Sequence, residues 1–449
     1  MTNGALSWRF PRLFWTGNAA ELCERAAYYG TFIALRTYLI RAVGLDDVQA
    51  GWLAGLFGAL IYFMPFLTGA AADSIGFRRS LLLAFGLLTA GYSLLGAFHG
   101  LAPVITGLVL IVLGGSFVKP VITGTVSKSS NETNRARAFS LFYMVVNIGS
   151  FTGKTIVAPM RIRMGVATVP WFSAAAALVG LVIVALIYFP RDEGERKVRS
   201  LRESLAGMRN AMTNGRFLAL ILITAGFWAI QGQLYASMPD YVLRMAGETY
   251  KPEWYANINP LVVLLFVVLV TQLVRKWKPQ NAILVAMCLI PMSAVVMSLS
   301  AWMHGMVHVF GLELHPITLM MIIGIAIQGF AECFLSPKWL EFASLQAPKG
   351  QEGTYLGFAH MNTFFAWLFG FVFSGYLLSR YCPEPGTLTP AVRAAREAAL
   401  VGNGPLPAAY AHAHYLWYAY AGVGLTSLIA MIVFIRVTKR LDARRREVA

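Results

Sequence analysis

Apolar stretches about 20 residues long recur throughout the chain, and a helix of that length crosses a hydrocarbon core of about 30 Å. The 449 residues are 57% hydrophobic and only 13% charged, with a mean hydropathy of +0.61. The repetition excludes a soluble enzyme behind one cleaved signal peptide. A membrane β-barrel would instead show segments of about 10 alternating residues. The pattern therefore predicts an all-α membrane protein.

We expect twelve spans in two sets of six, separated by a basic, polar segment. The predicted spans are 13–39, 48–72, 80–99, 102–126, 137–160, 165–189, 217–243, 257–274, 280–302, 315–343, 352–379 and 411–436. The segment 191–216 is rich in arginine and spaces Val198, Leu201, Leu205 and Met208 along one helical face. This spacing is typical of an amphipathic linker on a membrane surface. The predicted parts are a first half at 1–190, a linker at 191–216 and a second half at 217–449.

The formal net charge of +16 comes from clusters of cations between the apolar runs, which argues for a lipid bilayer as partner and against nucleic acid. Most of these clusters fall in alternate loops, on one side of the membrane. They are Arg78/Arg79, Lys128/Arg135/Arg137, the linker, Arg275/Lys276/Lys278 and the tail Lys439/Arg440/Arg444/Arg445/Arg446. Because cations collect in cytoplasmic loops, we expect a multi-pass protein of the plasma (inner) membrane with both termini cytoplasmic. A monomer is expected.

Few residues point to metal or covalent chemistry. The four cysteines have no paired spacing, and His304 and His308 have no third ligand near them in the sequence. No nucleophile elbow, phosphate loop or zinc-protease motif is present. We therefore expect no enzyme, no metal and no cofactor. Residues 391–400 are expected to form a surface helix in the loop before the last span.

Three ionisable residues lie in the middle of the first predicted span. Glu21, Glu24, Arg25 and Tyr28 follow the spacing i, i+3, i+4 and i+7, which places them on one helical face. A charge at the membrane centre costs about 2.5–3.5 kcal/mol, so such residues normally face a wet cavity and mark a transport path. The alternative is a salt-bridged cluster that only holds helices together, which explains one pair better than two acids.

Further polar side chains lie within the other spans. They are Lys119, Asn147, Lys154, Gln231, Gln233, Asn259 and Glu332. Lys119 has no acid near it in the sequence, so its charge needs a partner, and the acids of the first span are the obvious candidates. Glu332 shares a helical face with Ser336. It is predicted to hold a cation or to take up a proton, the alternative being a carboxyl group neutralised by its packing.

Two blocks of six spans joined by a basic linker resemble the major facilitator superfamily, in which two halves enclose a central cavity. The loop 69–79, Gly-Ala-Ala-Ala-Asp-Ser-Ile-Gly-Phe-Arg-Arg, is similar to the superfamily motif Gly-x-x-x-Asp-x-x-Gly-x-Arg-Arg/Lys. Arg78 and Arg79 alone would equally fit cations that simply face the cytoplasm. The resemblance implies a twelve-helix fold with two six-helix halves.

Several segments also resemble the proton-dependent oligopeptide transporter family. Glu21–Gly30 matches its signature Glu-x-x-Glu-Arg-Phe-x-Tyr-Tyr-Gly except that Ala26 replaces the Phe. Phe142–Ser150 is similar to its Phe-Tyr-x-x-x-Asn-x-Gly-Ser segment. Lys119-Pro120, Asn259-Pro260 and Glu332–Pro337 look like further family segments, so the resemblance covers both halves.

The family resemblance implies roles for individual residues. Glu21, Glu24, Arg25 and Lys119 would form the proton-linked network. The implied substrate contacts are Arg25, Tyr28, Tyr29, Tyr62, Lys119, Asn147, Trp228, Asn259, Glu332 and Ser336. The expected function is proton-coupled symport of di-/tripeptides or similar small zwitterionic solutes by alternating access, with protons as the coupling ion.

Two departures from the family pattern bear on this function. Phe32 stands where the family commonly has a second cation, and Gly232 stands where its Phe-Trp-x-x-x-Glu-Gln pattern has an acid. The chain also has no room for the two extra helices that many bacterial members insert. An exporter or uncoupled facilitator of another small organic solute is therefore an alternative. A non-transporting receptor or a membrane-embedded enzyme on the same fold is a further alternative.

Overall fold

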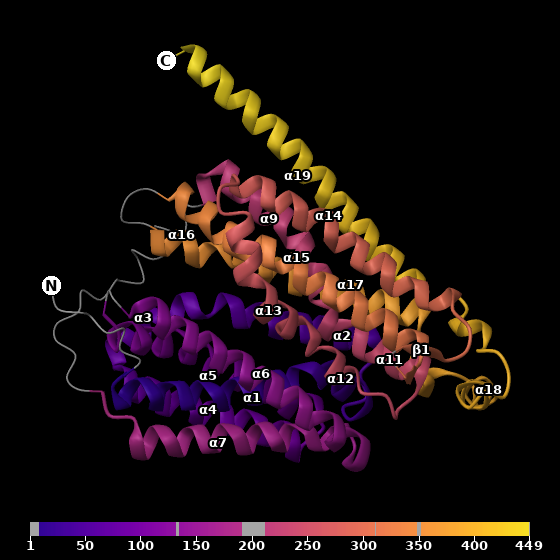
Figure 1. Cartoon of the computed structure of the whole chain (residues 1–449). Helices are drawn as coiled ribbons and strands as arrows, with labels where there is room; N and C mark the ends of the chain where they lie inside the picture. Colours follow the sequence, from indigo (N-terminus) through magenta and orange to yellow (C-terminus); the bar gives the residue numbers. More distant parts are fainter. Residues whose placement is uncertain (1–8, 132–133, 191–211, 310, 348–351, 449) are drawn as a thin grey trace. The chain divides into compact units, whose positions relative to one another are not determined.

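The computed structural model describes residues 9–131, 134–190, 212–309, 311–347 and 352–448 (Figure 1). Most of the predicted linker at 191–216 lies outside these residues. Within the described ranges, ten helices are long and apolar enough to cross a membrane. The 30-residue helix with the embedded charges and the predicted second span complete the twelve expected spans. The prediction of an all-α membrane fold is confirmed.

Residue contacts divide the chain into two compact units. Unit 1 comprises Met1–Gly44 and Leu60–Glu203, and unit 2 comprises Leu45–Ala59 and Ser204–Ala449. The helix α2 (Asp47–Phe63) therefore begins in unit 2 and ends in unit 1. The other helices among the described residues of unit 1 are α1 (Arg12–Arg41), α3 (Pro65–Ile75), α4 (Phe77–Ala97), α5 (Leu101–Lys128), α6 (Arg135–Met164), the 3-10 turn η1 (Val166–Thr168) and α7 (Val169–Ile187).

Unit 1 is built around α1, which packs against α5, α6 and α7. A Cβ atom at Gly153 of α6 would lie 2.3 Å from the carbonyl oxygen of Ala26, and one at Gly149 would lie 2.7 Å from the Cβ of Arg25. Glycines four residues apart let two helix backbones approach closely in a membrane protein. This pair sets the depth at which α6 meets the charged part of α1.

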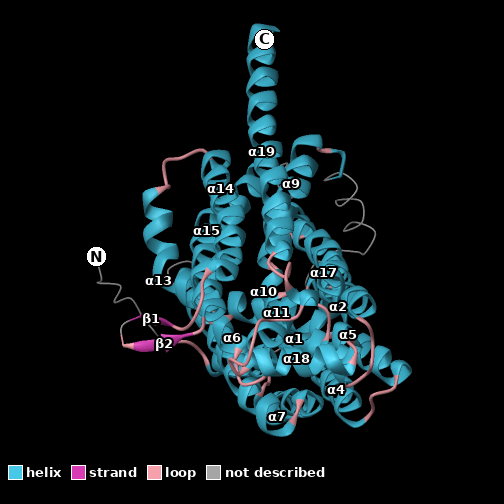
Figure 2. Cartoon of the chain, turned by 90° about the vertical axis from the view of Figure 1, so that its right-hand side faces the viewer, coloured by secondary structure: helices cyan, strands magenta, loops and turns pink. Residues whose placement is uncertain are grey.

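Unit 2 contains the remaining helices and one small hairpin, which is drawn in magenta in Figure 2. Its elements are α9 (Gly215–Gln231), α10 (Gln233–Ala236), α11 (Met238–Ala246), α12 (Pro252–Tyr255), α13 (Ile258–Leu273), α14 (Pro279–Ser298), η2 (Leu299–Trp302), β1 (Val307–Val309), β2 (Leu312–Leu314), α15 (Pro316–Gln346), α16 (Glu352–Ala359), α17 (Met361–Tyr381), η3 (Pro385–Thr387), α18 (Pro390–Leu400), η4 (Ala408–Tyr410) and α19 (Tyr415–Val448). The strands are antiparallel, with Val307 opposite Leu314.

Some predicted spans are interrupted. The span 48–72 is two helices, because Pro65 has no N–H to continue α2 and instead starts α3. The span 217–243 is divided into α9, α10 and α11 by turns at Gly232 and Ser237. The helix predicted at 391–400 is present as α18, although Arg396 on it is only 5% exposed.

The part of α2 that belongs to unit 2 packs on α17 through glycines. A Cβ atom at Gly51 would lie 2.7 Å from the carbonyl oxygen of Phe371, and one at Gly375 would lie 2.5 Å from that of Asp47. Gly55 would meet the carbonyl oxygen of Leu368 at 3.0 Å. The contact is therefore made by backbone atoms, and side chains larger than hydrogen do not fit at these positions.

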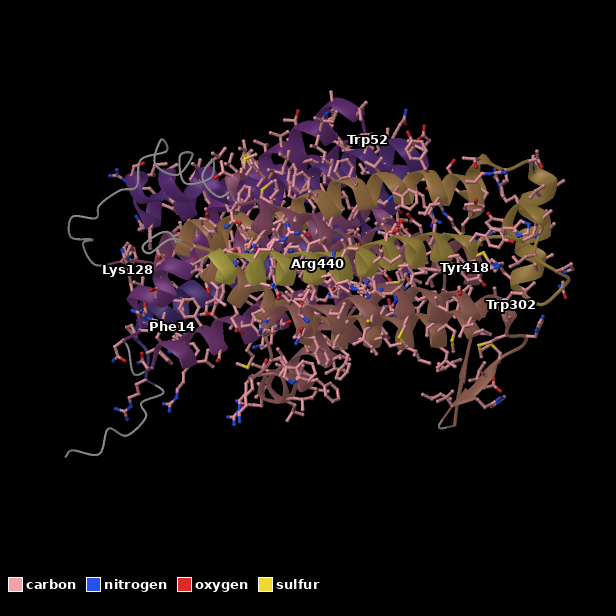
Figure 3. All side chains as sticks on the ribbon, turned by 90° about the horizontal axis from the view of Figure 1, so that it is seen from above. Phe14, Trp52, Lys128, Trp302, Tyr418 and Arg440 are labelled. Atoms are coloured by element: carbon pink, nitrogen blue, oxygen red, sulfur yellow. The ribbon has the colours of Figure 1, made fainter. Side chains whose placement is uncertain are left out.

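The long helix α19 differs in composition between its ends. Near its start, the hydroxyl of Tyr418 lies 3.4 Å from the indole nitrogen of Trp302, and Figure 3 shows the two side chains beside each other. Aromatic side chains of this kind favour the interface between membrane and water. The last turns carry cations and extend past the neighbouring helices of unit 2 in Figure 1. Arg216 of α9 forms an ion pair there with Asp442, at 2.5 Å.

Candidate functional site

The charges of the first predicted span form a cluster on α1. The Nε atom of Arg25 lies 3.4 Å from Glu21 Oε1 and also contacts Glu24 Oε2. The Arg25 side chain is 12% exposed and each carboxylate is 2% exposed. All three groups share one helix, as their spacing predicted. The guanidinium can therefore leave the carboxylates without separating two helices.

Aromatic rings surround the Arg25 guanidinium. Its Cζ atom lies 5.3 Å from the ring centre of Tyr28 and 5.8 Å from that of Tyr29, distances that suit a cation–π contact. The ammonium of Lys154 lies 5.7 Å from the ring of Tyr29. Phe32 stacks on Tyr28 with ring centres 5.3 Å apart. Where the family commonly has a cation, this chain thus has a ring that packs on a signature tyrosine.

Lys119 of α5 faces the same cluster but has a different environment from the one expected. It interacts electrostatically with Arg25, Glu21 and Glu24. Among the described residues, however, it forms no hydrogen bond or ion pair, and its side chain is exposed. Arg25, not Lys119, takes the direct ion pairs with the acids, because it is covalently held one and four residues from them on the same helix. Lys119 remains an exposed cation beside this cluster.

Two further predicted contacts in unit 1 are half-buried. Asn147 donates a hydrogen bond of 2.8 Å from Nδ2 to the carbonyl oxygen of Tyr143 on its own helix, α6. Its amide oxygen remains available as an acceptor. Tyr62 lies near the end of α2, within unit 1.

Unit 2 contains a second polar group, centred on Glu332 of α15. The Nε2 atom of Gln231, at the end of α9, donates to Glu332 Oε2 at 2.5 Å. Asn259 of α13 donates from Nδ2 to the same oxygen at 3.3 Å. A Cβ atom at Gly329, one turn before Glu332, would lie 3.0 Å from the Asn259 carbonyl oxygen, so glycine lets α13 approach α15.

The other predicted contacts of unit 2 lie near this carboxylate in the sequence or on α9. Ser336, one turn after Glu332, is half-buried. Trp228, one turn before Gly232, is half-buried, and its buried indole N–H has no hydrogen-bond partner in the described ranges. Gln233 binds backbone atoms instead of this carboxylate. It donates to the carbonyl oxygens of Ala229 at 2.7 Å and Gly370 at 3.3 Å, and thereby braces the turn after α9.

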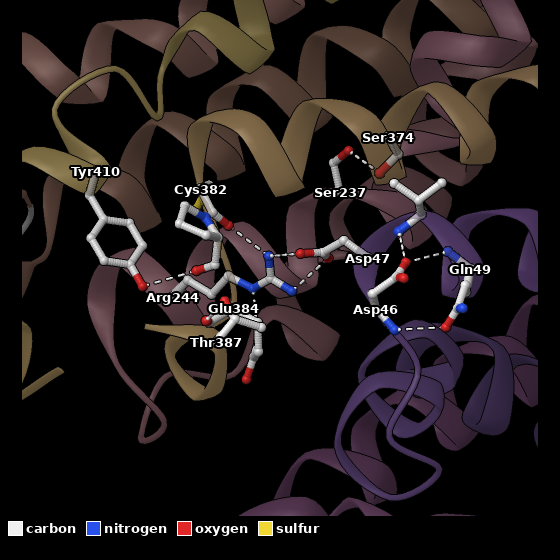
Figure 4. Close-up of polar contacts among 12 residues, drawn as sticks. Asp46, Asp47, Gln49, Ser237, Arg244, Ser374, Cys382, Glu384, Thr387 and Tyr410 are labelled. Atoms are coloured by element: carbon white, nitrogen blue, oxygen red, sulfur yellow. Dashed lines mark hydrogen bonds and ion pairs between the residues drawn. The ribbon is translucent and has the colours of Figure 1, made fainter. Parts of the chain in front are cut away.

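Sequence reasoning missed a third polar group, which we call the Arg244 cluster: Asp47, Arg244, Glu384 and the Cys382 carbonyl (Figure 4). Arg244 is fully buried and contacts Asp47 at 2.8 Å and Glu384 at 2.9 Å. It also donates to the carbonyl oxygen of Cys382 at 2.6 Å. Burial lowers the pKa of Arg244, but the neighbouring carboxylates outweigh this and keep it above its usual value.

Two side chains support the Arg244 cluster from the loop before α19. Arg396 of α18 donates to the carbonyl oxygens of Leu243 at 2.9 Å and Arg244 at 2.8 Å, which satisfies the last carbonyls of α11. The hydroxyl of Tyr410 donates to the carbonyl oxygen of Pro383 at 2.9 Å. No motif marks this cluster, because Asp47 and Arg244 are 197 residues apart in the chain.

Long apolar helices with buried carboxylates, cations and amides inside each unit define a multi-pass membrane transporter. The sequence model of the Major Facilitator Superfamily, as a protein family, matches residues 19–312 of this chain. The chain belongs to this superfamily, whose members are membrane transporters rather than enzymes.

Individual curated relatives and solved structures show more specifically what this chain is similar to. The chain is 27% identical over 237 residues to dipeptide and tripeptide permease A of Klebsiella pneumoniae, covering 51% of this chain and 46% of that protein. It is 31% identical over 189 residues to the di-/tripeptide transporter of Lactococcus lactis, covering 40% and 37%. The aligned part thus spans about half or less of these relatives.

The fold matches solved structures over nearly the whole chain. A POT family transporter in complex with a thioalcohol-conjugated peptide has a TM-score of 0.72 at 18% identity, covering 96% of both chains. The POT family transporter PepTSo has a TM-score of 0.72 at 19% identity, covering 96% of this chain and 99% of that one. At these identities the solved structures show the fold, and the resemblance to peptide transporters is confirmed by the curated relatives named above.

Proposed function

We propose that this chain is a secondary active transporter that couples proton movement to symport of di-/tripeptides or similar small zwitterionic solutes, by alternating access. Relatives named for dipeptides and tripeptides support the substrate class. The proposed location is the plasma membrane, with both termini cytoplasmic. The cations at the end of α19 support that orientation. The proposed working form is a monomer.

The observation that carries this proposal is one charged side chain in each unit that has no ion-pair partner at contact distance among the described residues. Among the described residues, Lys119 in unit 1 has no carboxylate within ion-pair distance, and Glu332 in unit 2 accepts hydrogen bonds from amides but pairs with no cation. Within unit 1, Arg25 and Lys119 suit a carboxylate, and within unit 2, Glu332 suits an ammonium. A zwitterionic solute carries both of these groups.

Proton coupling is assigned to the α1 cluster. Protonation of Glu21 or Glu24 removes the charge that holds Arg25 and frees the guanidinium for the substrate carboxylate. Release of the proton on the other side restores the ion pair, which then competes with the substrate. The geometry that supports this exchange is the location of all three groups on one helix, where Arg25 can change partner by rotating its side chain.

Uptake into proteoliposomes tests the proposal. An inwardly directed proton gradient should drive accumulation of a labelled dipeptide, and a protonophore should abolish it. Lys119→Ala should reduce uptake about tenfold or more, as expected for loss of a charged hydrogen bond, whereas Lys276→Ala, in a loop, should not. Uptake that ignores the imposed gradient would overturn proton symport.

Gly232 favours a second candidate, an uncoupled facilitator or exporter of another small organic solute. A Cβ atom at this position would lie 3.7 Å from the Trp367 side chain and 3.1 Å from the Trp228 carbonyl oxygen. A side chain can thus be added with small adjustments. If the parent protein transports without coupling and Gly232→Glu introduces dependence on the proton gradient, the second candidate is correct for the natural chain.

A further inference from the structure

Gln231 is held against Glu332 in a way that fixes the orientation of its amide. A carboxylate accepts hydrogen bonds and donates none, so the N–H end of the amide must point toward it. The structure has this arrangement, with Nε2 of Gln231 2.5 Å from Glu332 Oε2. The carbonyl oxygen of Gln231 therefore faces away from the carboxylate.

That carbonyl oxygen is an unused acceptor. The Gln231 side chain is 7% exposed, and Oε1 has no hydrogen-bond partner within the part of the chain that the structure describes. On Glu332, both amide donors converge on Oε2, and no described residue donates to Oε1. Buried acceptors without donors are rare in folded proteins. Here the carboxylate and its neighbouring amide each retain one oxygen for a donor from elsewhere.

The backbone that carries Gln231 is fixed. Gln231 is the last residue of α9, and the N–H of Gly232 donates to the carbonyl oxygen of Trp228 at 2.8 Å. Two residues on, Oε1 of Gln233 accepts from the hydroxyl of Ser237 at 2.7 Å, and Ser237 also bonds Ser374 of α17, a contact drawn in Figure 4. The amide of Gln231 is thus presented from a braced turn rather than from a mobile loop.

We propose that Gln231 is a specificity-determining residue that, together with Glu332, selects solutes with a primary ammonium group. A primary ammonium has three N–H donors and can satisfy the Glu332 carboxylate and Gln231 Oε1 at the same time. A quaternary ammonium carries the same charge but no donor, so it leaves the Gln231 oxygen buried and unpaired. Sites built to hydrogen-bond a substrate reject analogues that lack the donor, because their own polar groups are then left unsatisfied.

The inference rests on the proposed function, in which Glu332 binds the substrate ammonium. Gly232 sharpens it. Because glycine stands where the family pattern has an acid, Gln231 provides a neutral acceptor next to a single carboxylate, and the group as a whole carries one negative charge. Selection then depends on the number of N–H donors as well as on charge.

The test compares alanyl-alanine with its N,N,N-trimethyl derivative, since both carry one positive charge at the amino end. Inhibition constants are measured against uptake of a labelled dipeptide in proteoliposomes, and binding is measured separately by thermal stabilisation in detergent. The variants are Gln231→Met, which keeps the length and loses the amide, and Gln231→Glu, which keeps an acceptor. Gln272→Met, the same change at an exposed position on α13, is the control.

In the parent protein and Gln272→Met, alanyl-alanine should bind more tightly than the trimethyl derivative. Gln231→Met should reduce this preference about tenfold, and Gln231→Glu should preserve it. If Gln231→Met fails to fold, loss of the preference in Gln231→Glu overturns the inference. If Glu332→Gln loses alanyl-alanine binding but Gln231→Met keeps the parent's preference, the inference is wrong and the proposed function stands. If the parent protein binds neither compound, the proposed function itself is wrong.

Discussion

Arg25 and Arg244 are both arginines in contact with two carboxylates, yet their partners come from different places. The partners of Arg25 are one and four residues away on the same helix. Those of Arg244 come from the start of α2 and from the loop after α17, and a third contact is the Cys382 carbonyl. Arg25 is 12% exposed and Arg244 is fully buried. An ion pair within one helix can open without unfolding, whereas one that joins three segments stabilises tertiary structure.

The largest expected effect concerns the thiol of Cys382, the residue whose carbonyl oxygen belongs to the Arg244 cluster. Its reactivity should differ strongly between the native and the unfolded protein. Burial, together with the nearby Asp47 and Asp240 carboxylates, raises the pKa of its thiol to about 12. At pH 8 the thiolate population should therefore be about 1000-fold smaller than in the unfolded protein. A protein that keeps only this cysteine should react with a maleimide correspondingly more slowly when native than when unfolded in detergent. The native rate should rise with pH between about pH 7 and pH 9 as the thiolate fraction grows. Equal native and unfolded rates would show that water reaches the cluster.

Removing the buried guanidinium should be the most destabilising single change. Arg244→Met leaves the buried carboxylates of Asp47 and Asp240 and the half-buried carboxylate of Glu384 without this cation, and should cost about 3–5 kcal/mol. The Tm in detergent should fall by at least about 5 °C. The double variant Asp47→Asn/Arg244→Met should recover part of the loss, because one of the carboxylate charges is then absent. A Tm equal to that of the parent would remove the structural role of the cluster.

The matching change in unit 1 should affect transport more than stability. Arg25→Ala removes the proposed carboxylate ligand and should lower substrate affinity about 10- to 100-fold. Its Tm should fall less than that of Arg244→Met, because the two acids are on one helix and can be neutralised by protons. Arg25→Lys, which keeps the charge, should retain part of the affinity. Unchanged affinity in Arg25→Ala would refute the assignment.

Neutralising one or the other acid of α1 should reduce uptake by different, smaller factors. Glu24 contacts Arg25 directly, whereas Glu21 is 3.4 Å away and its second oxygen has no hydrogen-bond partner among the described residues. Glu24→Gln should therefore reduce gradient-driven uptake about tenfold more than Glu21→Gln. Counterflow exchange, which needs no net proton movement, should be less affected by either change. The reverse order would assign the proton to Glu21.

What the sequence predicts here depends on how far apart the interacting residues are in the chain. The face formed by Glu21, Glu24 and Arg25 was predictable because helical spacing alone brings these residues together. The helix breaks before Pro65 and at Gly232 each follow from a single residue. The predicted spans 48–72 and 217–243 nevertheless ran across them.

Contacts between distant segments could not be predicted. Gln231 and Glu332 are 101 residues apart, and Asp47 and Arg244 are 197 apart. The sequence shows that each of these polar residues lies in or at the end of an apolar span. Hydrophobic periodicity does not say which other helix packs against it. For the same reason Lys119 was expected to pair with the acids of α1, although Arg25 on that helix already holds them.

The glycine contact between α2 and α17 has a consequence for how often it can be broken. Gly51, Gly55 and Gly375 bring backbone against backbone, and the one side-chain atom close to them is the Cβ of Phe371. A Cβ atom has no rotamer of its own, so separating this contact would need no rotamer change. Separating the Arg244 cluster, in contrast, would break ion pairs that must form again.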